Sequence, residues 1–209
     1  ESITCNDSAL IAAVKIEYAD GTEDFIPTDS TWECAKSNIL DSSVYNGETV
    51  DFTFNTDETF PVKELDDVNK DILLPTEGEE VREMARLDAL KLITTPKGET
   101  VIDFGQNLTG YVEWVVPQRK GAEFTIYHAE ILDKDGNFYI GNMRSAKNEI
   151  RFICDGNEHT FKPHYTFQGF RYIKLVNFSD EIKLENFTAI VVHSELKRIG
   201  NFRCSSEML

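Results

Sequence analysis

The sequence predicts an all-β protein, folded as a β-sandwich or barrel. Two observations carry this prediction. Short runs of alternating apolar and polar residues recur along the chain, and Gly, Asp and Asn residues separate them at the roughly 8–12-residue spacing typical of such folds. The chain has 209 residues, of which 41% are hydrophobic, so it can bury a core without disulfide or metal staples.

The first predicted element is a hairpin near the N-terminus. Residues 13–18 alternate in polarity, Asp20-Gly21 supplies a tight turn, and residues 24–26 return. The second half of the chain holds more strand patterns, at residues 112–116, 123–128, 149–154, 159–163, 170–176 and 188–193.

Two of these strand patterns carry a further expectation. The Asp-Gly-Asn turn at residues 155–157 predicts that the strand at 159–163 returns along the strand at 149–154. The run at 188–193 is almost continuously apolar, which predicts a strand buried on both faces.

Residues 77–92 do not show a clear strand pattern. They are rich in Glu, Arg, Met, Ala and Leu, and composition alone therefore slightly favours a helix. Leu90, Leu92 and the Thr-Thr-Pro exit at residues 94–96 suit an extended strand instead. The preceding stretch, residues 55–78, is acidic with little periodicity and predicts a linker or a long surface connection.

The charge balance excludes one class of function. The chain has 21 Lys and Arg residues and 37 Asp and Glu residues, which gives a net charge of −16. A general nucleic-acid binder needs a basic face, and an anionic membrane surface would repel this chain. No apolar run approaches the roughly 18 residues of a membrane span. A neutral sugar or a cationic partner remains compatible.

No metal or nucleophile motif stands out. The four cysteines are scattered without a CxxC pair, so we expect free thiols in a reducing compartment; a cytoplasmic location is favoured and export stays open. The four histidines lie in different segments and are expected to be structural. Residues 133–137 resemble a calcium loop but fail its spacing, which predicts a turn. The acidic pairs at 66–67 and 79–80 predict a solvated face.

Two segments are unusual in composition. Residues 103–110 crowd two glycines with Asp103, Gln106 and Asn107 between two strand patterns. We favour a turn held by side-chain hydrogen bonds, with a polar edge facing a sugar or a neighbouring domain as the alternative. Residues 165–172 are dense in aromatic residues, which favours core packing with Arg171 paired to a carboxylate over a ligand platform.

Several motifs together match one family. They stand in the same order and spacing as in that family, at residues 103–110, 127–137, 142–147, 167–172, 191–194 and 200–205. This set resembles bacterial α-L-rhamnosidases. Residues 18–21, 28–32 and 45–48 are similar to the second half of the β-domain that precedes these motifs in the same enzymes.

The resemblance implies a domain plan. It implies a concanavalin-like, jelly-roll antiparallel β-sandwich at residues 80–209, a linker at 61–79, and part of an upstream β-sandwich at residues 1–60. It also implies that residues 77–92 are extended, and this replaces the helix. Some members use the upstream domain for calcium-dependent rhamnose binding, so calcium stays open, and no other cofactor or metal ligand is expected.

The resemblance also implies a function. Its enzymes hydrolyse terminal α-L-rhamnose from plant glycosides or polysaccharides with inversion, using two carboxylates on an (α/α)6 barrel that would begin after Leu209. We therefore expect a non-catalytic accessory region that supports this barrel, its intramolecular partner. No catalytic residue is carried over. Asp103, Gln106 and Asn107 are candidates for bordering the domain interface or the active site.

Two alternatives remain. In a carbohydrate-binding module, Trp32 and Tyr45 would stack on the sugar while Asn46 and Glu48 take its hydroxyls. A turn with core aromatics is the favoured explanation of those residues. The third possibility is a purely structural spacer.

Overall fold

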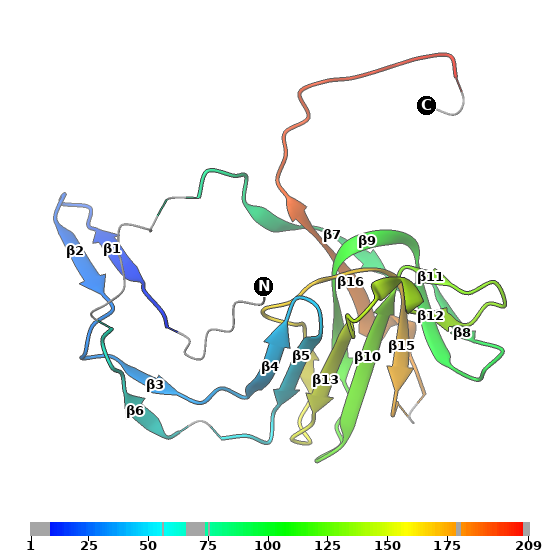
Figure 1. The fold of residues 1–209 in the computed structure, drawn as a ribbon, viewed down its shortest axis with the longest axis horizontal. Coiled ribbons are helices and arrows are strands. Elements are labelled where there is room, and N and C mark those ends of the chain that lie inside the picture. The colour runs from blue at the N-terminus through cyan, green and yellow to red at the C-terminus, as the bar shows by residue number, and fades with distance from the viewer. Residues whose placement is uncertain (1–8, 56, 66–73, 75, 179–180, 207–209) are drawn as a thin grey trace. The chain divides into compact units, whose positions relative to one another are not determined.

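The computed structural model describes residues 9–55, 57–65, 74, 76–178 and 181–206, and these are almost entirely strands, turns and loops (Figure 1). The all-β prediction is confirmed. The helices among them are single 3-10 turns, none of which offers the long apolar run of a membrane span. The chain divides into two compact units, Glu1–Ser37 with Thr56–Pro75, and Asn38–Asn55 with Thr76–Leu209.

The first unit is built from two strand pairs. Strands β1 (Ala13–Glu17) and β2 (Glu23–Pro27) form the predicted antiparallel hairpin, and β3 (Glu33–Ala35) pairs with β6 (Thr59–Pro61). At the hairpin turn the Asp20 carboxylate accepts hydrogen bonds from the N–H and hydroxyl of residue 22.

The second unit holds one large sheet. Its strands run in the order β4-β5-β13-β10-β15-β9-β16-β7, and β8 and β14 also pair with β9. Apart from the parallel pair β5–β13, the ladders are antiparallel. The strands are β4 (Ile39–Ser43), β5 (Gly47–Asp51), β7 (Val81–Asp88), β8 (Lys91–Thr94), β9 (Thr100–Val116), β10 (Glu123–Ala129), β11 (Ile131–Leu132), β12 (Phe138–Tyr139), β13 (Glu149–Ile153), β14 (His159–Phe161), β15 (Gln168–Val176) and β16 (Phe187–Ser194).

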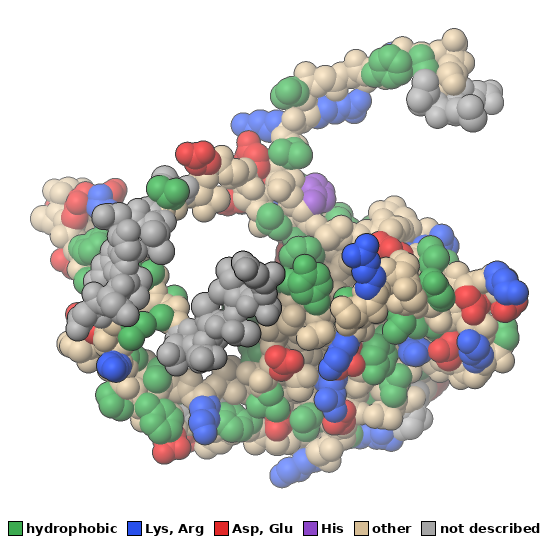
Figure 2. Space-filling view, viewed as in Figure 1, with side chains coloured by type: hydrophobic (Ala, Val, Ile, Leu, Met, Phe, Trp, Pro, Cys, Tyr) green, Lys and Arg blue, Asp and Glu red, His purple; other side chains and the backbone are tan. Residues whose placement is uncertain are grey.

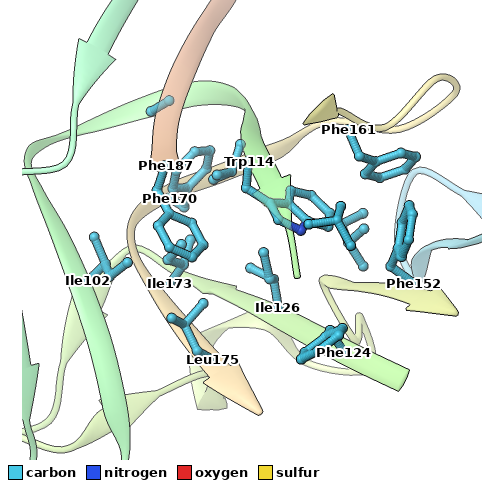
Figure 3. Packing of buried hydrophobic residues seen from close by; sticks show 14 of the residues in the cluster. Ile102, Trp114, Phe124, Ile126, Phe152, Phe161, Phe170, Ile173, Leu175 and Phe187 are labelled. Atoms are coloured by element: carbon cyan, nitrogen blue, oxygen red, sulfur yellow. The ribbon is translucent and has the colours of Figure 1, made fainter. Parts of the chain in front are cut away.

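The sheet curls over so that two layers face each other, which confirms the sandwich. The first part of β9 pairs with β8 and the second half of β15, whereas its last part pairs with β14 and β16. The rings of Trp114 on β9 and Phe152 on β13 lie 6.3 Å apart, although these two strands do not pair (Figure 3). Their contact therefore crosses the core between the layers.

The core is filled by inward-facing side chains from both layers. Ile126, Phe152, Phe170 and Ile173 are completely buried, and Trp114 is 1% exposed (Figure 3). On β16 the neighbouring residues 189 and 190 point to opposite faces and both are fully buried. The prediction of a strand covered on both faces is therefore confirmed at its centre.

Two predictions, a helix at residues 77–92 and a β13–β14 hairpin, were wrong because the strands in these segments pair with other strands. The helix favoured by composition for residues 77–92 is absent from its described part, where β7 pairs with β16 and β8 pairs with β9. An available sheet edge overrides helix propensity, and the extended form implied by the resemblance is confirmed. After its turn, β14 does not pair with β13; it crosses to β9, with Phe161 opposite Trp114.

The favoured turn at residues 103–110 was also wrong. The segment lies inside the 17-residue strand β9, although residues 105–107 are exposed and the ladder with β15 shifts register between Asp103 and Leu108. Gly110 has φ +158, and a Cβ on it would lie 1.8 Å from the carbonyl oxygen of Ile190 on β16. Because glycine has no side chain, β9 can lie this close to β16 at Gly110. Local composition alone would instead predict a turn.

The domain boundaries at residues 60 and 80 stay a prediction. Residues 38–55, which that prediction assigns to the upstream region, form β4 and β5 in the second unit. The register of β5 on β13 pairs Gly47 with Glu149 and Asp51 with Ile153.

We expect Gly110→Ala to destabilise the second unit by about 3 kcal/mol or more, because the added methyl group overlaps backbone that cannot move away. Urea unfolding would measure this. Gly98→Ala is the matched control, since Gly98 has φ +80 but open space around it, and it should cost only about 1 kcal/mol. Equal costs for the two variants would contradict the steric explanation.

Candidate functional site

A surface hollow of about 330 Å³ lies on the second unit, and we call it the Glu130 groove. Three sequence motifs meet there: residues 127–137, 142–147 and 167–172. Its lining residues are Val44, Tyr45, Glu130, Asn142, Met143, Arg144, Ala146, Asn148, Phe167, Gln168 and Gly169. Residues more than 100 positions apart thus share one concave surface.

Glu130 is held in place by its neighbours. It directly follows β10, and the side-chain amide of Asn142, in the 3-10 turn Gly141–Met143, donates a 2.9 Å hydrogen bond to its Oε2. A Cβ at Gly169 on β15 would lie 3.2 Å from Glu130 Oε1. The carboxylate therefore lies against the backbone of β15, where the absence of a side chain makes room for it.

Arg144 follows the same turn with an unusual backbone. Its φ is 57° and its ψ is −112°, a conformation that residues other than glycine rarely adopt. Such strain costs on the order of 1 kcal/mol and persists only where the surrounding structure holds it. The turn therefore fixes the backbone from which the guanidinium projects.

The groove also offers aromatic surface. Tyr45 is 71% exposed and Phe167 is 46% exposed. Gln168 is buried, and its amide donates to the Thr166 hydroxyl at 2.9 Å. Carboxylate, guanidinium, amides and exposed rings together can hold a small hydroxylated molecule.

Asp103 and Arg171 form the ion pair that the aromatic segment predicted. Arg171 Nε lies 2.8 Å from Asp103 Oδ1 and Nη2 lies 3.0 Å from Oδ2, while the N–H of Gly105 also donates to Oδ1. Burial raises the pKa of Asp103, but the hydrogen bonds from Arg171 and Gly105 outweigh it and leave this pKa below its usual range. Gln106 and Asn107 are exposed on β9, and their role at an interface stays a prediction.

Comparison with known proteins identifies the family. The chain matches the family models of the α-L-rhamnosidase N-terminal domain at residues 1–83 and of the bacterial α-L-rhamnosidase concanavalin-like domain at residues 93–193. The α-L-rhamnosidase of Streptomyces avermitilis is 32% identical to it over 96% of the chain and 21% of its own length. That of Alteromonas sp. is 31% identical over 96% of the chain and 23% of its own length.

Solved structures agree with this match. The α-L-rhamnosidase of Aspergillus terreus superimposes with a TM-score of 0.83 at 30% identity, over 94% of this chain and 24% of its own. The Streptomyces avermitilis enzyme complexed with L-rhamnose gives a TM-score of 0.79 at 30% identity, over 88% of this chain and 19% of its own. The chain belongs to the α-L-rhamnosidase family. It corresponds to the non-catalytic N-terminal β-domains and spans about a fifth to a quarter of these relatives.

The sugar-binding set predicted for a rhamnosidase β-domain is divided between the units. Trp32 belongs to the first unit, where its indole N–H donates to the carbonyl of Pro27. Tyr45, Asn46 and Glu48 belong to the second. Tyr45 lines the Glu130 groove, and the carbonyl of Asn46 accepts the N–H of residue 149. Binding by the four residues stays a prediction.

Glu48 has a structural role in this rhamnosidase domain. It is 1% exposed, and its carboxylate accepts hydrogen bonds from the backbone N–H groups of His164 and Tyr165 at 3.0–3.1 Å. These bonds tie β5 to the segment that leads into β15. A sugar hydroxyl would therefore have to compete with the fold for this carboxylate.

His128 supports a wall of the groove from inside. It is 1% exposed, its Nδ1–H donates to the carbonyl of Asn148 at 3.0 Å, and its Nε2 has no hydrogen-bond partner among the described residues. Burial lowers the pKa of His128 to about 4, against the opposing effect of the bond to Asn148. The imidazole is therefore neutral near pH 7.

No metal site stands out in the part of the chain that is described, since it holds no group of three or more His, Cys, Asp or Glu side chains suited to an ion. Residues 133–137 form the predicted turn, in which the Asp133 carboxylate accepts the N–H groups of Asp135 and Asn137. Cys34 and Cys154 carry free thiols, and burial raises the pKa of Cys154 to about 11. Residues 5 and 66–67 lie outside the described residues.

Sequence reasoning missed Glu130, Asn142, Arg144 and Phe167 as site residues. Each lies in a segment that carried the family resemblance, but no local pattern marks any of them as a ligand-facing side chain. Only the fold brings them together. Their shared membership of family motifs was the signal available.

We expect Glu48→Ala to reduce the free energy of unfolding by about 2 kcal/mol, because two backbone N–H groups lose their acceptor. Urea unfolding would measure it, with the exposed Glu185→Ala as the control, expected within about 0.5 kcal/mol of wild type. A Glu48→Ala variant as stable as this control would refute the structural role.

We also expect a pH dependence from His128. The unfolded chain takes up this proton near pH 6.5 and the folded chain near pH 4, so the unfolded state binds more protons between these values. Stability should therefore fall by about 3 kcal/mol as pH drops through this window. Urea midpoints between pH 7 and pH 4 should be less pH-dependent in His128→Gln; parallel curves would disprove the assignment.

Proposed function

We propose that this chain is the accessory β-domain region of an α-L-rhamnosidase, an enzyme that hydrolyses terminal α-L-rhamnose from glycosides. Catalysis belongs to an (α/α)6 domain that these 209 residues do not include, and the β-domains support and border it. The observation that carries the proposal is the alignment of nearly the whole chain with α-L-rhamnosidases over only about a fifth to a quarter of their length.

The chemistry of the groove supports a non-catalytic role. Inverting glycosidases need two carboxylic groups about 6.5–9.5 Å apart, one as acid and one as base. The Glu130 groove is lined by a single carboxylate. Glu130 therefore has no partner acid in the groove with which to divide these tasks.

Exposed apolar side chains support contact with further protein. From residue 195 to residue 206 the chain has no helix or strand, and there Leu196 is 75%, Ile199 100% and Phe202 76% exposed. Figure 2 shows hydrophobic side chains along this extended segment. On β7 Val81 and Met84 are also exposed. Apolar side chains gathered on one segment are typical of a surface that another domain covers.

We expect no release of 4-nitrophenol from 4-nitrophenyl α-L-rhamnoside by the purified chain, since the Glu130 groove holds a single carboxylate. Activity that follows the chain through purification would overturn the proposal.

The supporting role calls for a second experiment. In the Streptomyces avermitilis α-L-rhamnosidase, the segment that matches this chain can be replaced by it or deleted. We expect the replacement to retain rhamnoside hydrolysis and the deletion to lose soluble, active enzyme. A replacement as inactive as the deletion, or an active deletion, would contradict a supporting role.

A further inference from the structure

We propose that the Glu130 groove binds a single neutral pyranose ring, and that a 6-deoxy sugar is its preferred ligand. The preference for a pyranose rests on the groove itself. The choice of L-rhamnose among 6-deoxy sugars rests on the proposed function. This site differs from the predicted set around Trp32 and Glu48 and shares only Tyr45 with it.

The size of the groove favours a small ligand. Its volume of about 330 Å³ lies at the lower end of the roughly 300–1,000 Å³ found for small-molecule sites. One sugar ring matches this volume better than an extended polymer. Gln168 and Gly169 lie at the start of β15, and the rest of the lining comes from the 3-10 turn and from loops that adjoin β5, β10, β13 and β15.

The polar groups of the groove suit hydroxyls. Asn142 holds Glu130 Oε2 at 2.9 Å and thereby orients the carboxylate, whose two oxygens can accept a pair of neighbouring hydroxyl groups. Arg144 adds hydrogen-bond donors to the lining, and Asn142 and Gln168 add amides. Donors and acceptors on one small surface match the mixed hydrogen-bonding of a sugar ring.

The charge of the groove favours a neutral ligand. Glu130 and Arg144 contribute one charge of each sign, and the groove has no other charged side chain in its lining. The chain as a whole carries a net charge of −16, which repels anions. An acidic sugar or a phosphorylated ligand is therefore disfavoured.

Apolar side chains complete the match. The exposed rings of Tyr45 and Phe167 can cover the C–H face of a pyranose, as aromatic surfaces do in sugar recognition. Val44 and Met143 also line the groove and offer contacts for a methyl group. A 6-deoxy sugar carries a methyl group where most hexoses carry a hydroxymethyl group.

The test is a titration of the ¹⁵N-labelled 209-residue chain followed by NMR, with a chelator present throughout. L-Rhamnose, D-glucose and D-glucuronate are the three probes. We expect saturable shifts of the amides of Glu130, Asn142 and Gly169 with L-rhamnose, weaker ones with D-glucose and none with D-glucuronate.

Variants assign the effect to the carboxylate. Glu130→Gln should weaken L-rhamnose binding about tenfold, the loss of one charge-assisted hydrogen bond, without changing the melting temperature. Glu185→Gln makes the same change of charge at an exposed position outside the groove and should leave affinity unchanged. Phe167→Ala should also weaken binding, which tests the aromatic contact independently.

Three results would overturn the proposal. They are no saturable shift in the groove with L-rhamnose, equal affinity for D-glucuronate, or unchanged affinity in Glu130→Gln. Shifts that centre on Trp32 would support the sequence-predicted set instead. The segment replacement described above tests the accessory role separately, so either proposal can fail while the other stands.

Discussion

The architecture of the second unit depends on β9 serving both layers of the sandwich. One end of this strand pairs with β8 and β15 and the other with β14 and β16, so the strand has to bend, and its ladder with β15 shifts register between Asp103 and Leu108. Gly110 meets this requirement, because its backbone lies closer to Ile190 than any side chain would allow. The core contact between Trp114 and Phe152 follows from that bend.

The strands β9 and β15 also position polar side chains, among them Asp103 and Glu130. Asp103 lies where the ladder between β9 and β15 shifts register, and its pairing with Arg171 joins the two strands there. β15 also carries Gly169, which makes room for Glu130 in the groove. A buried acid such as Glu48 and a buried neutral imidazole such as His128 fit the same pattern, since each satisfies backbone groups that join separate segments.

Alternation of polarity was enough to predict β10, β15 and the hairpin β1–β2, and a nearly continuous apolar run predicted β16, which is buried on both faces at its centre. It failed where local composition and tertiary pairing disagreed. Residues 103–110 carry the glycines and amides of a turn, and residues 77–92 carry helix formers, yet an available ladder holds the described part of both extended. The groove could not be predicted, since Tyr45, Glu130 and Phe167 become neighbours only when three distant segments pack together.

The parallel pairing of β5 with β13 has a consequence for how the chain is made. The partners Gly47 and Glu149 are separated by about 100 residues, a long loop to close before the ladder can form. During synthesis β4 and β5 leave the ribosome well before β13, β10 and β15. The unpaired edge of β5 and the apolar face of both strands then stay exposed, and other nascent chains can bind them. Folding of the sandwich is completed only after β16 has emerged.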